Sequence, residues 1–110
     1  MLQSYCRYNV FVLLKTTPAW LAMSRSERDG FSAAIMEAAL AGTDIRVNHF
    51  DAEAFSGRCT DIAQFEASDL RTFYGVMERL RGSALFSVPY FEVVDIIPSI
   101  RNGYREIDLM

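Results

Sequence analysis

The chain has 110 residues, of which 51% are hydrophobic, and its 11 basic and 14 acidic residues leave a net charge of −3. This length fits one domain with one core, residues 1–110, and the apolar content excludes intrinsic disorder. The weak negative charge argues against nucleic acid or an anionic membrane as a partner, because no basic stripe is available to neutralise phosphates.

The N-terminus and the cysteines indicate the compartment. No apolar run reaches the roughly 20 residues of a transmembrane helix, and the first seven residues lack a basic region followed by an apolar core. We therefore expect a cytoplasmic protein with no membrane partner. Cys6 and Cys59 match no metal-binding spacing, and in the cytoplasm we expect both to be free thiols.

The first part of the chain predicts a strand and a helix. Residues 8–15 are rich in β-formers and apolar on both faces, which predicts a strand, and residues 16–23 follow as a loop. Ser24 is expected to start a helix, with Glu27 completing a capping box, and Gly42 stands where a C-terminal glycine is expected. Helical spacing predicts that this helix buries Phe31, Ile35, Ala38 and Ala39.

The remaining elements are two strands, a helix and a last strand. Residues 44–50 alternate, which places Ile45, Val47 and His49 on one face of a strand, and residues 60–66 form the next strand. Ser68 or Asp69 caps the second helix. Its expected apolar stripe is Leu70, Phe73, Tyr74, Met77 and Leu80. Residues 88–98 are aromatic and β-branched between two prolines, and predict a last strand that is apolar on both faces.

This order of elements is that of the ferredoxin-like α+β fold, a βαββαβ unit. It predicts a four-stranded antiparallel sheet, with the first strand between the third and the fourth and two helices on one face. The first and last strands are also apolar on the other face, and a soluble monomer rarely exposes so large a patch. Because a twofold partner can cover such a face, we expect a homodimer, the dimeric α+β barrel.

Several motifs also resemble those of a known family. They are TPAWL at residues 17–21, FDAEAFS at residues 50–56 and VPYFEVVDIIP at residues 88–98, followed by Gly103-Tyr104. Together they resemble the darcynin family of small bacterial proteins, and the resemblance spans nearly the whole chain. That family is of uncharacterised function, so the resemblance implies no catalytic residues. The wider dimeric α+β barrel group is similar in element order only, and fold analogy does not choose among its activities.

Three single residues are candidates for chemistry. His49 is the only histidine and could act as a general base, but its alternation with Ile45 and Val47 favours a half-buried strand residue. The sequence near it holds no cluster typical of a metal site, and we expect neither metal nor cofactor. Asp95, predicted on the helix side, is expected to cap a loop or to pair with Arg101 or Arg105 rather than to catalyse. Trp20 either closes a pocket or fills a gap beside the first helix.

A set of polar residues shares the sheet face that the helices are expected to leave open. Its members as candidate ligand-binding residues are Arg46, Asn48, Gln64, Tyr90 and Glu92. An apolar chamber with a few polar groups is typical of a small-ligand site. One hypothesis is therefore a protein that binds or transforms a small apolar or aromatic metabolite inside the barrel without metal. The alternative is a structural or interaction dimer without catalytic activity, in which these residues serve only the subunit contact. Whether the protein is an enzyme stays open at this stage.

Overall fold

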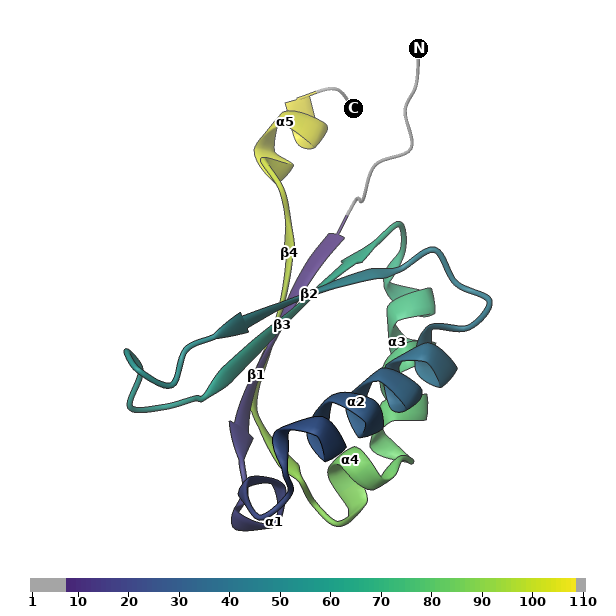
Figure 1. Cartoon of the computed structure of the whole chain (residues 1–110). Helices are drawn as coiled ribbons and strands as arrows, with labels where there is room; N and C mark the ends of the chain where they lie inside the picture. The colour runs from purple at the N-terminus through teal and green to yellow at the C-terminus, as the bar shows by residue number, and fades with distance from the viewer. Residues whose placement is uncertain (1–7, 109–110) are drawn as a thin grey trace.

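The computed structural model describes residues 8–108, so the prediction for Cys6 lies outside the described residues. Figure 1 shows the order of the elements along the chain. They are β1 (Tyr8–Thr16), α1 (Pro18–Leu21), α2 (Arg25–Leu40), β2 (Arg46–Asp51), β3 (Asp61–Ala67), α3 (Leu70–Arg81), α4 (Ala84–Ser87), β4 (Phe91–Ile100) and α5 (Gly103–Asp108). The region predicted as a loop at residues 16–23 therefore contains a short helix, which Thr17 caps and Pro18 begins.

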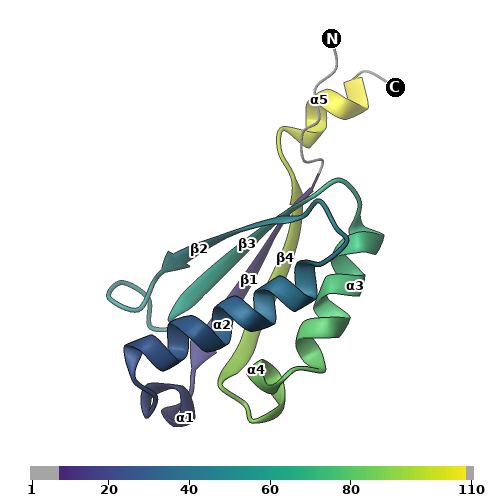
Figure 2. The ribbon, with the colours of Figure 1, turned by 45° about the vertical axis from the view of Figure 1, so that its right-hand side comes forward.

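The four strands form one antiparallel sheet in the order β2-β3-β1-β4. Figure 2 shows that α2 and α3 lie side by side and cover one face of this sheet. Arg79 joins the two helices, because its guanidinium donates hydrogen bonds of 2.9 Å to the carbonyl oxygens of Ala39 and Ala41 at the end of α2. The predicted ferredoxin-like α+β arrangement is thus confirmed.

The core lies between the sheet and the helices. Alternate residues of β1, namely Val10, Val12 and Leu14, point toward the helices and are at most 8% exposed. Phe65 of β3 packs edge-to-face against Phe73 of α3, with ring centroids 5.4 Å apart. Ile45, Ala67, Val76, Met77, Leu80, Leu85 and Phe91 complete most of the cluster. This one-sided core explains why the sheet keeps its other face free.

The ends of the helices follow the predicted local chemistry. Ser24 Oγ accepts a hydrogen bond of 3.2 Å from the Glu27 amide, and Glu27 Oε1 accepts one of 2.7 Å from the Ser24 amide. The amide of Ser24, followed by its hydroxyl, lowers the pKa of Glu27 from its ordinary value of 4.5. Gly42 has φ +78°, the left-handed conformation that favours glycine after a helix. Asp69 caps α3 by accepting a hydrogen bond of 2.7 Å from the Thr72 amide.

The predicted apolar stripes of the two helices are right only in part. In α3, Phe73, Met77 and Leu80 are buried as predicted, whereas Tyr74 is 65% exposed and Leu70 is 40% exposed. Val76, which the predicted stripe omitted, is 1% exposed and belongs to the core cluster. In α2, Ala39 is buried but Ala38 is exposed. Sequence spacing defines a stripe only to within about one position.

A bulge in β4 corrects the predicted faces of the last strand. Leu13 of β1 lies opposite Asp95, whereas Leu14 lies opposite Val93, so Val94 is an extra residue in the ladder. Ile96 consequently lies opposite the buried Val12 and packs against the core, although the alternation predicted it on the open face.

The bulge also moves Asp95, which was predicted on the helix side. Its position opposite Leu13 puts it on the open face, where it is exposed. Its Oδ1 accepts a hydrogen bond of 2.8 Å from the Ile96 amide, and the structure shows no pair between it and an arginine. Of the two alternatives for Asp95, the pair with an arginine is therefore not found among the described residues.

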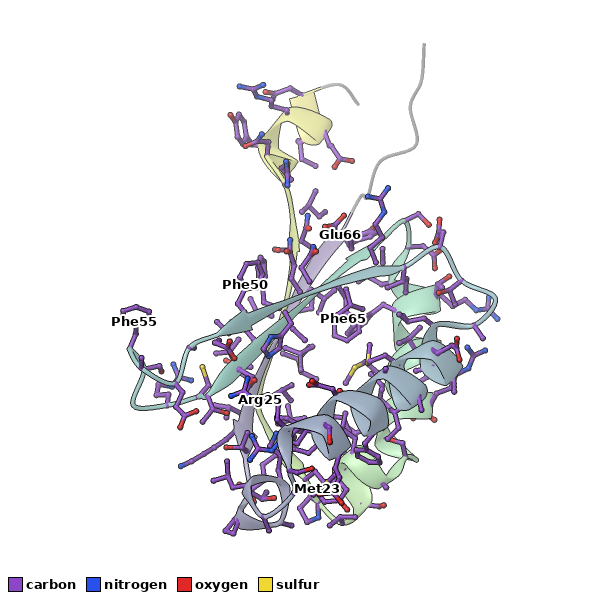
Figure 3. The ribbon with its side chains drawn as sticks, in the orientation of Figure 1. Met23, Arg25, Phe50, Phe55, Phe65 and Glu66 are labelled. Carbon is purple, nitrogen blue, oxygen red and sulfur yellow. The ribbon has the colours of Figure 1, made fainter. Side chains whose placement is uncertain are left out.

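The sheet face away from the helices is apolar at its centre. Phe11 and Leu13 of β1, Ile62 of β3 and Val94 of β4 are half-buried there. Phe50 is 49% exposed and Ile97 is 44% exposed. Figure 3 shows Phe50 and Phe65 on opposite sides of the sheet, with Phe65 toward the helices. We call this surface the open face.

The C-terminal part of the described chain lies apart from the helix layer. β4 pairs with β1 as far as its last residue, Ile100, and leads to α5, which stands beyond the sheet end rather than on α2 or α3 (Figures 1 and 2). Within α5, Tyr104 and Ile107 are more than half exposed. Among residues 8–108, no helix is both long enough and apolar enough to span a membrane.

Candidate functional site

A cavity of about 520 Å³ lies between α2 and the sheet. This volume is within the range of about 300–1,000 Å³ that small-ligand sites occupy. Its apolar wall is formed by Val12, Leu14, Ala33, Met36, Leu40, Ile45, Val47, Ala63, Phe65, Met77, Leu80 and Phe91. Its polar residues are Asp29, Ser32, Arg46 and His49. The site therefore has an apolar wall and a few polar groups at its border.

The cavity exists because the two long helices pack differently on the sheet. α3 buries Phe73, Val76, Met77 and Leu80, which fill the space beneath it. The one fully buried residue of α2 is Ala39, near its C-terminal end. Toward the cavity, α2 presents the small side chains of Ser32 and Ala33, and β3 presents Ala63. Small residues on both sides leave open volume where larger ones would fill the layer.

His49 stands at the border of the cavity, on β2. It shares the helix-side face with Val47, because Val47 lies opposite Phe65 and His49 lies opposite Ala63. That face was predicted correctly, but the side chain is 55% exposed rather than half-buried among apolar residues. Its Nε2 lies 2.6 Å from Asp61 Oδ2 and 3.8 Å from Asp51 Oδ1. The histidine thus has two carboxylates as neighbours.

Asp61 is the best-fixed member of this group. Its side chain is 14% exposed, and its Oδ1 accepts a hydrogen bond of 2.5 Å from the Thr60 hydroxyl. Thr60 is itself held by the hydrogen bond of 2.8 Å from its amide to the carbonyl oxygen of Leu14. Asp51 is 88% exposed and free to change rotamer. We call His49, Asp51 and Asp61 the His-Asp cluster.

An aromatic cluster stands beside Phe91, which lines the cavity. Trp20 packs against Phe91 with ring centroids 4.8 Å apart, and Phe31 packs edge-to-face against Tyr90 at 4.9 Å. Trp20 is 9% exposed and belongs to the core. It fills the gap between the first loop and α2, which was one of its two predicted roles.

Tyr90 departs from the prediction. It was expected on the open face among the candidate ligand-binding residues, but it precedes β4 and its ring packs against Trp20 and Phe31 on the helix side. The bend that precedes the strand is responsible, because the Tyr90 amide donates to the carbonyl oxygen of Leu85 and its carbonyl accepts from the Thr17 amide. The strand begins only at Phe91.

Of the other predicted ligand-binding residues, Asn48, Gln64 and Glu92 lie on the open face, and Arg46 begins the edge strand β2. Asn48 Nδ2 donates hydrogen bonds to Gln64 Oε1 at 3.3 Å and to Glu66 Oε2 at 2.7 Å, and Gln64 Nε2 donates to Asn9 Oδ1 at 2.8 Å. Glu92 lies opposite Lys15, and Arg46 lies opposite Glu66. The structure therefore joins Asn48 and Gln64 in one hydrogen-bond network. Glu92 lies outside this network, several residue pairs away in the sheet.

The helix-side cavity is not lined by Asn48, Gln64 or Glu92, whereas Arg46 borders it at the start of β2. Sequence reasoning placed the ligand chamber on the opposite side of the sheet. It also missed Asp51 and Asp61. The alternation His49-Phe50-Asp51 put Asp51 on the face of His49, but the approach of Asp61 depends on the register between β2 and β3.

The chain is similar in sequence to one known family. The family Darcynin, described as a domain of unknown function, matches residues 4–108. "Darcynin" of Chromobacterium violaceum is 49% identical over 65 residues, which are 59% of this chain and 82% of the relative. "Darcynin 1" of Acinetobacter baumannii is 40% identical over 89 residues, which are 80% of this chain and 99% of the relative.

Solved structures are similar in fold. A heme-binding protein from Thermus thermophilus has a TM-score of 0.74 at 13% identity, over 97% of this chain and 45% of its own. A putative chlorite dismutase has a TM-score of 0.73 at 18% identity, over 88% of this chain and 44% of its own. This chain therefore spans less than half the length of these neighbours. At such identities the likeness shows a shared fold and no shared activity.

Proposed function

Because this chain belongs to the darcynin family, whose function is unknown, we propose a function from the site itself: binding of a small apolar molecule in the cavity between α2 and the sheet. The observation that carries the proposal is the cavity of about 520 Å³ with an apolar wall and polar groups only at its border. Burial of an apolar molecule there is favourable at roughly 25 cal/mol per Å² of apolar surface. The polar groups would orient one polar end of the ligand.

The polar border favours a ligand with one polar end. His49 and Arg46 on β2 and Asp29 and Ser32 on α2 offer both donors and acceptors there. The remaining twelve lining residues are apolar, so the body of the ligand must be apolar as well. An aromatic or short aliphatic metabolite with one hydroxyl, carbonyl or carboxyl group has this chemistry.

The heme-binding neighbour raises the question of whether the cavity fits a heme. The chain has one histidine, and its Nε2 is 2.6 Å from a carboxylate while its side chain is 55% exposed at the border. A heme in the cavity would need an axial ligand directed into the apolar space. The residues present do not fit that requirement, and we propose a ligand without a heme iron.

The proposal can be tested with the single tryptophan of the chain. Trp20 touches Phe91, and Phe91 lines the cavity, so a bound molecule should change the Trp20 fluorescence. We would titrate the protein with anilinonaphthalene sulfonate and then screen small aromatic and aliphatic metabolites by thermal shift, since a ligand that binds the native state raises its stability. Saturation at one site per chain is the expected result.

A matched pair of variants locates the site. Ala33 and Ala34 are both exposed residues of α2, but only Ala33 lines the cavity. Ala33→Phe should weaken binding by roughly tenfold or more, because the ring enters the space of the ligand, whereas Ala34→Phe should bind as the wild type does. Equal affinity of the two variants, or no saturable binding across the screen, would rule out this cavity as the site.

We also propose that two copies of the chain associate through the open face. The exposed Phe50 and Ile97 and the half-buried Phe11 and Leu13 support this, because water exposure of such a patch is unfavourable. The chains of the similar solved structures are more than twice as long as the part that this chain matches. Two copies of this chain would therefore be about as long as one chain of such a neighbour. A purely structural dimer is the competing function, and it predicts that the ligand screen finds nothing.

A further inference from the structure

We infer that the His-Asp cluster at the border of the cavity is a binding site for a divalent first-row transition ion, with Zn²⁺ as the type case. Its donors are His49 Nε2, an oxygen of Asp51 and an oxygen of Asp61, and all three lie within 4.8 Å of one another. Imidazole and carboxylate are the ligands that such ions accept. The sequence led us to expect no metal, because Asp61 is brought to His49 only by the fold.

The distances need only a small adjustment to hold an ion. Ligand atoms at about 2.1 Å from a tetrahedral ion are roughly 3.4 Å apart. His49 Nε2 is 2.6 Å from Asp61 Oδ2 and 3.8 Å from Asp51 Oδ1, so these two distances lie on either side of that value. Asp51 is 88% exposed and can rotate inward at little cost, while Asp61 is already held by Thr60.

The pairing of charges in the sheet supports a cation at this place. Two other pairs in the sheet join opposite charges: Arg46 faces Glu66, and Lys15 faces Glu92. Asp51 and Asp61, however, are directly opposite each other. Like charges in that relation destabilise a strand pair unless a cation lies between them. Within residues 8–108, no lysine or arginine forms an ion pair with either carboxylate.

The position of the cluster would place a bound ion beside the proposed ligand. Three protein ligands leave at least one coordination position for water or for a ligand group. His49 borders the cavity, so that position is beside the polar end of the molecule that we propose there. The substrate class then narrows to apolar molecules with an oxygen donor, such as a carboxylate or a phenol. This consequence depends on the proposed function, whereas the ion site itself does not.

The test uses the full chain without a histidine tag, freed of metal by a chelator, and Zn²⁺ alone as the probe. Since His49 is the only histidine, the proton on its Cε1 gives a single resonance that reports directly on the site. We expect Zn²⁺ to shift this resonance with saturation at one ion per chain, and calorimetry to give the same stoichiometry. No shift at millimolar Zn²⁺ would overturn the inference.

Variants then separate a three-ligand site from binding to the histidine alone. Asp51→Asn and Asp61→Asn should each weaken binding by roughly tenfold or more, because even residues that only support a metal ligand have effects of about 10–100-fold. Asp51 is largely exposed, so its variant should fold normally even if the Asp61 variant does not. Glu37→Gln, which removes the same charge at an exposed position outside both the cluster and the cavity lining, should bind as the wild type does.

Wild-type affinity in Asp51→Asn would overturn the three-ligand site. The ligand screen of the preceding section is run without metal, and this titration is run without ligand. Failure of the cavity proposal and failure of the ion site are therefore separate results.

Discussion

Replacement of Phe73 by alanine tests the packing that shapes the cavity. Phe73 is 8% exposed, and its ring is 5.4 Å from that of Phe65, which lines the cavity wall. A buried phenylalanine removes about 150–250 Å² from water. At roughly 25 cal/mol per Å² the loss of most of that area costs about 3–4 kcal/mol. The hole left beside Phe65 and the lost ring pair raise the expected cost to about 3–5 kcal/mol.

Urea denaturation measures this cost. With a slope of about 1–3 kcal/mol per molar urea, the midpoint of unfolding should fall by roughly 2 M. Wild type and variant must be compared at one protein concentration, because association of two copies would make the midpoint depend on it. The matched control is Tyr74→Ala at the next position of α3, where the side chain is 65% exposed. That variant should lose less than about 1 kcal/mol.

The comparison can refute the reasoning in two ways. A loss below about 1 kcal/mol in Phe73→Ala would mean that α3 does not use this residue to pack on β3. Equal losses in the two variants would mean that the rotation of α3 in the structure is wrong, since the two side chains point in different directions. In either case the proposed packing of the cavity wall would be wrong.

Two further predictions concern the open face and the start of α3. Ile97→Asp places a charge on the open face and should convert the dimer to a monomer in a sedimentation experiment. The control is Leu70→Asp, which should leave the dimer unchanged; Leu70 is 40% exposed and Ile97 is 44% exposed. A wild-type monomer at micromolar concentration would contradict the proposed association. The Thr72 amide, followed by its hydroxyl, lowers the pKa of Asp69 from 3.8, so this cap stabilises fully above that value and the effect is lost as the pH falls through the lowered pKa. Asp69→Ala should therefore reduce the urea midpoint at pH 7 more than at pH 2, and an equal reduction at both would show that the charge of Asp69 plays no part.

Local chemistry was sufficient to predict the four strands, the two long helices and their order, but not the short helices α1, α4 and α5. The capping box of Ser24 and Glu27, the left-handed Gly42 and the alternation around Val47 each depend on neighbours within a few residues. Such signals can be recognised in the sequence without the tertiary structure. Once the order strand, helix, strand, strand, helix, strand was read, the rules of chain connection left the ferredoxin-like sheet as the natural result.

The candidate site, in contrast, was decided by tertiary structure. The cavity depends on the open volume that Ser32 and Ala33 of α2 leave opposite Ala63 of β3, and α2 and β3 are far apart in the sequence. The bulge at Val94 reversed the faces of Asp95 and Ile96, because one extra residue shifts all that follow it. The His-Asp cluster needs the register that sets Asp51 opposite Asp61. The spacing of residues along the chain predicts local elements. Which distant side chains come into contact is decided only when the strands pair and the helices pack.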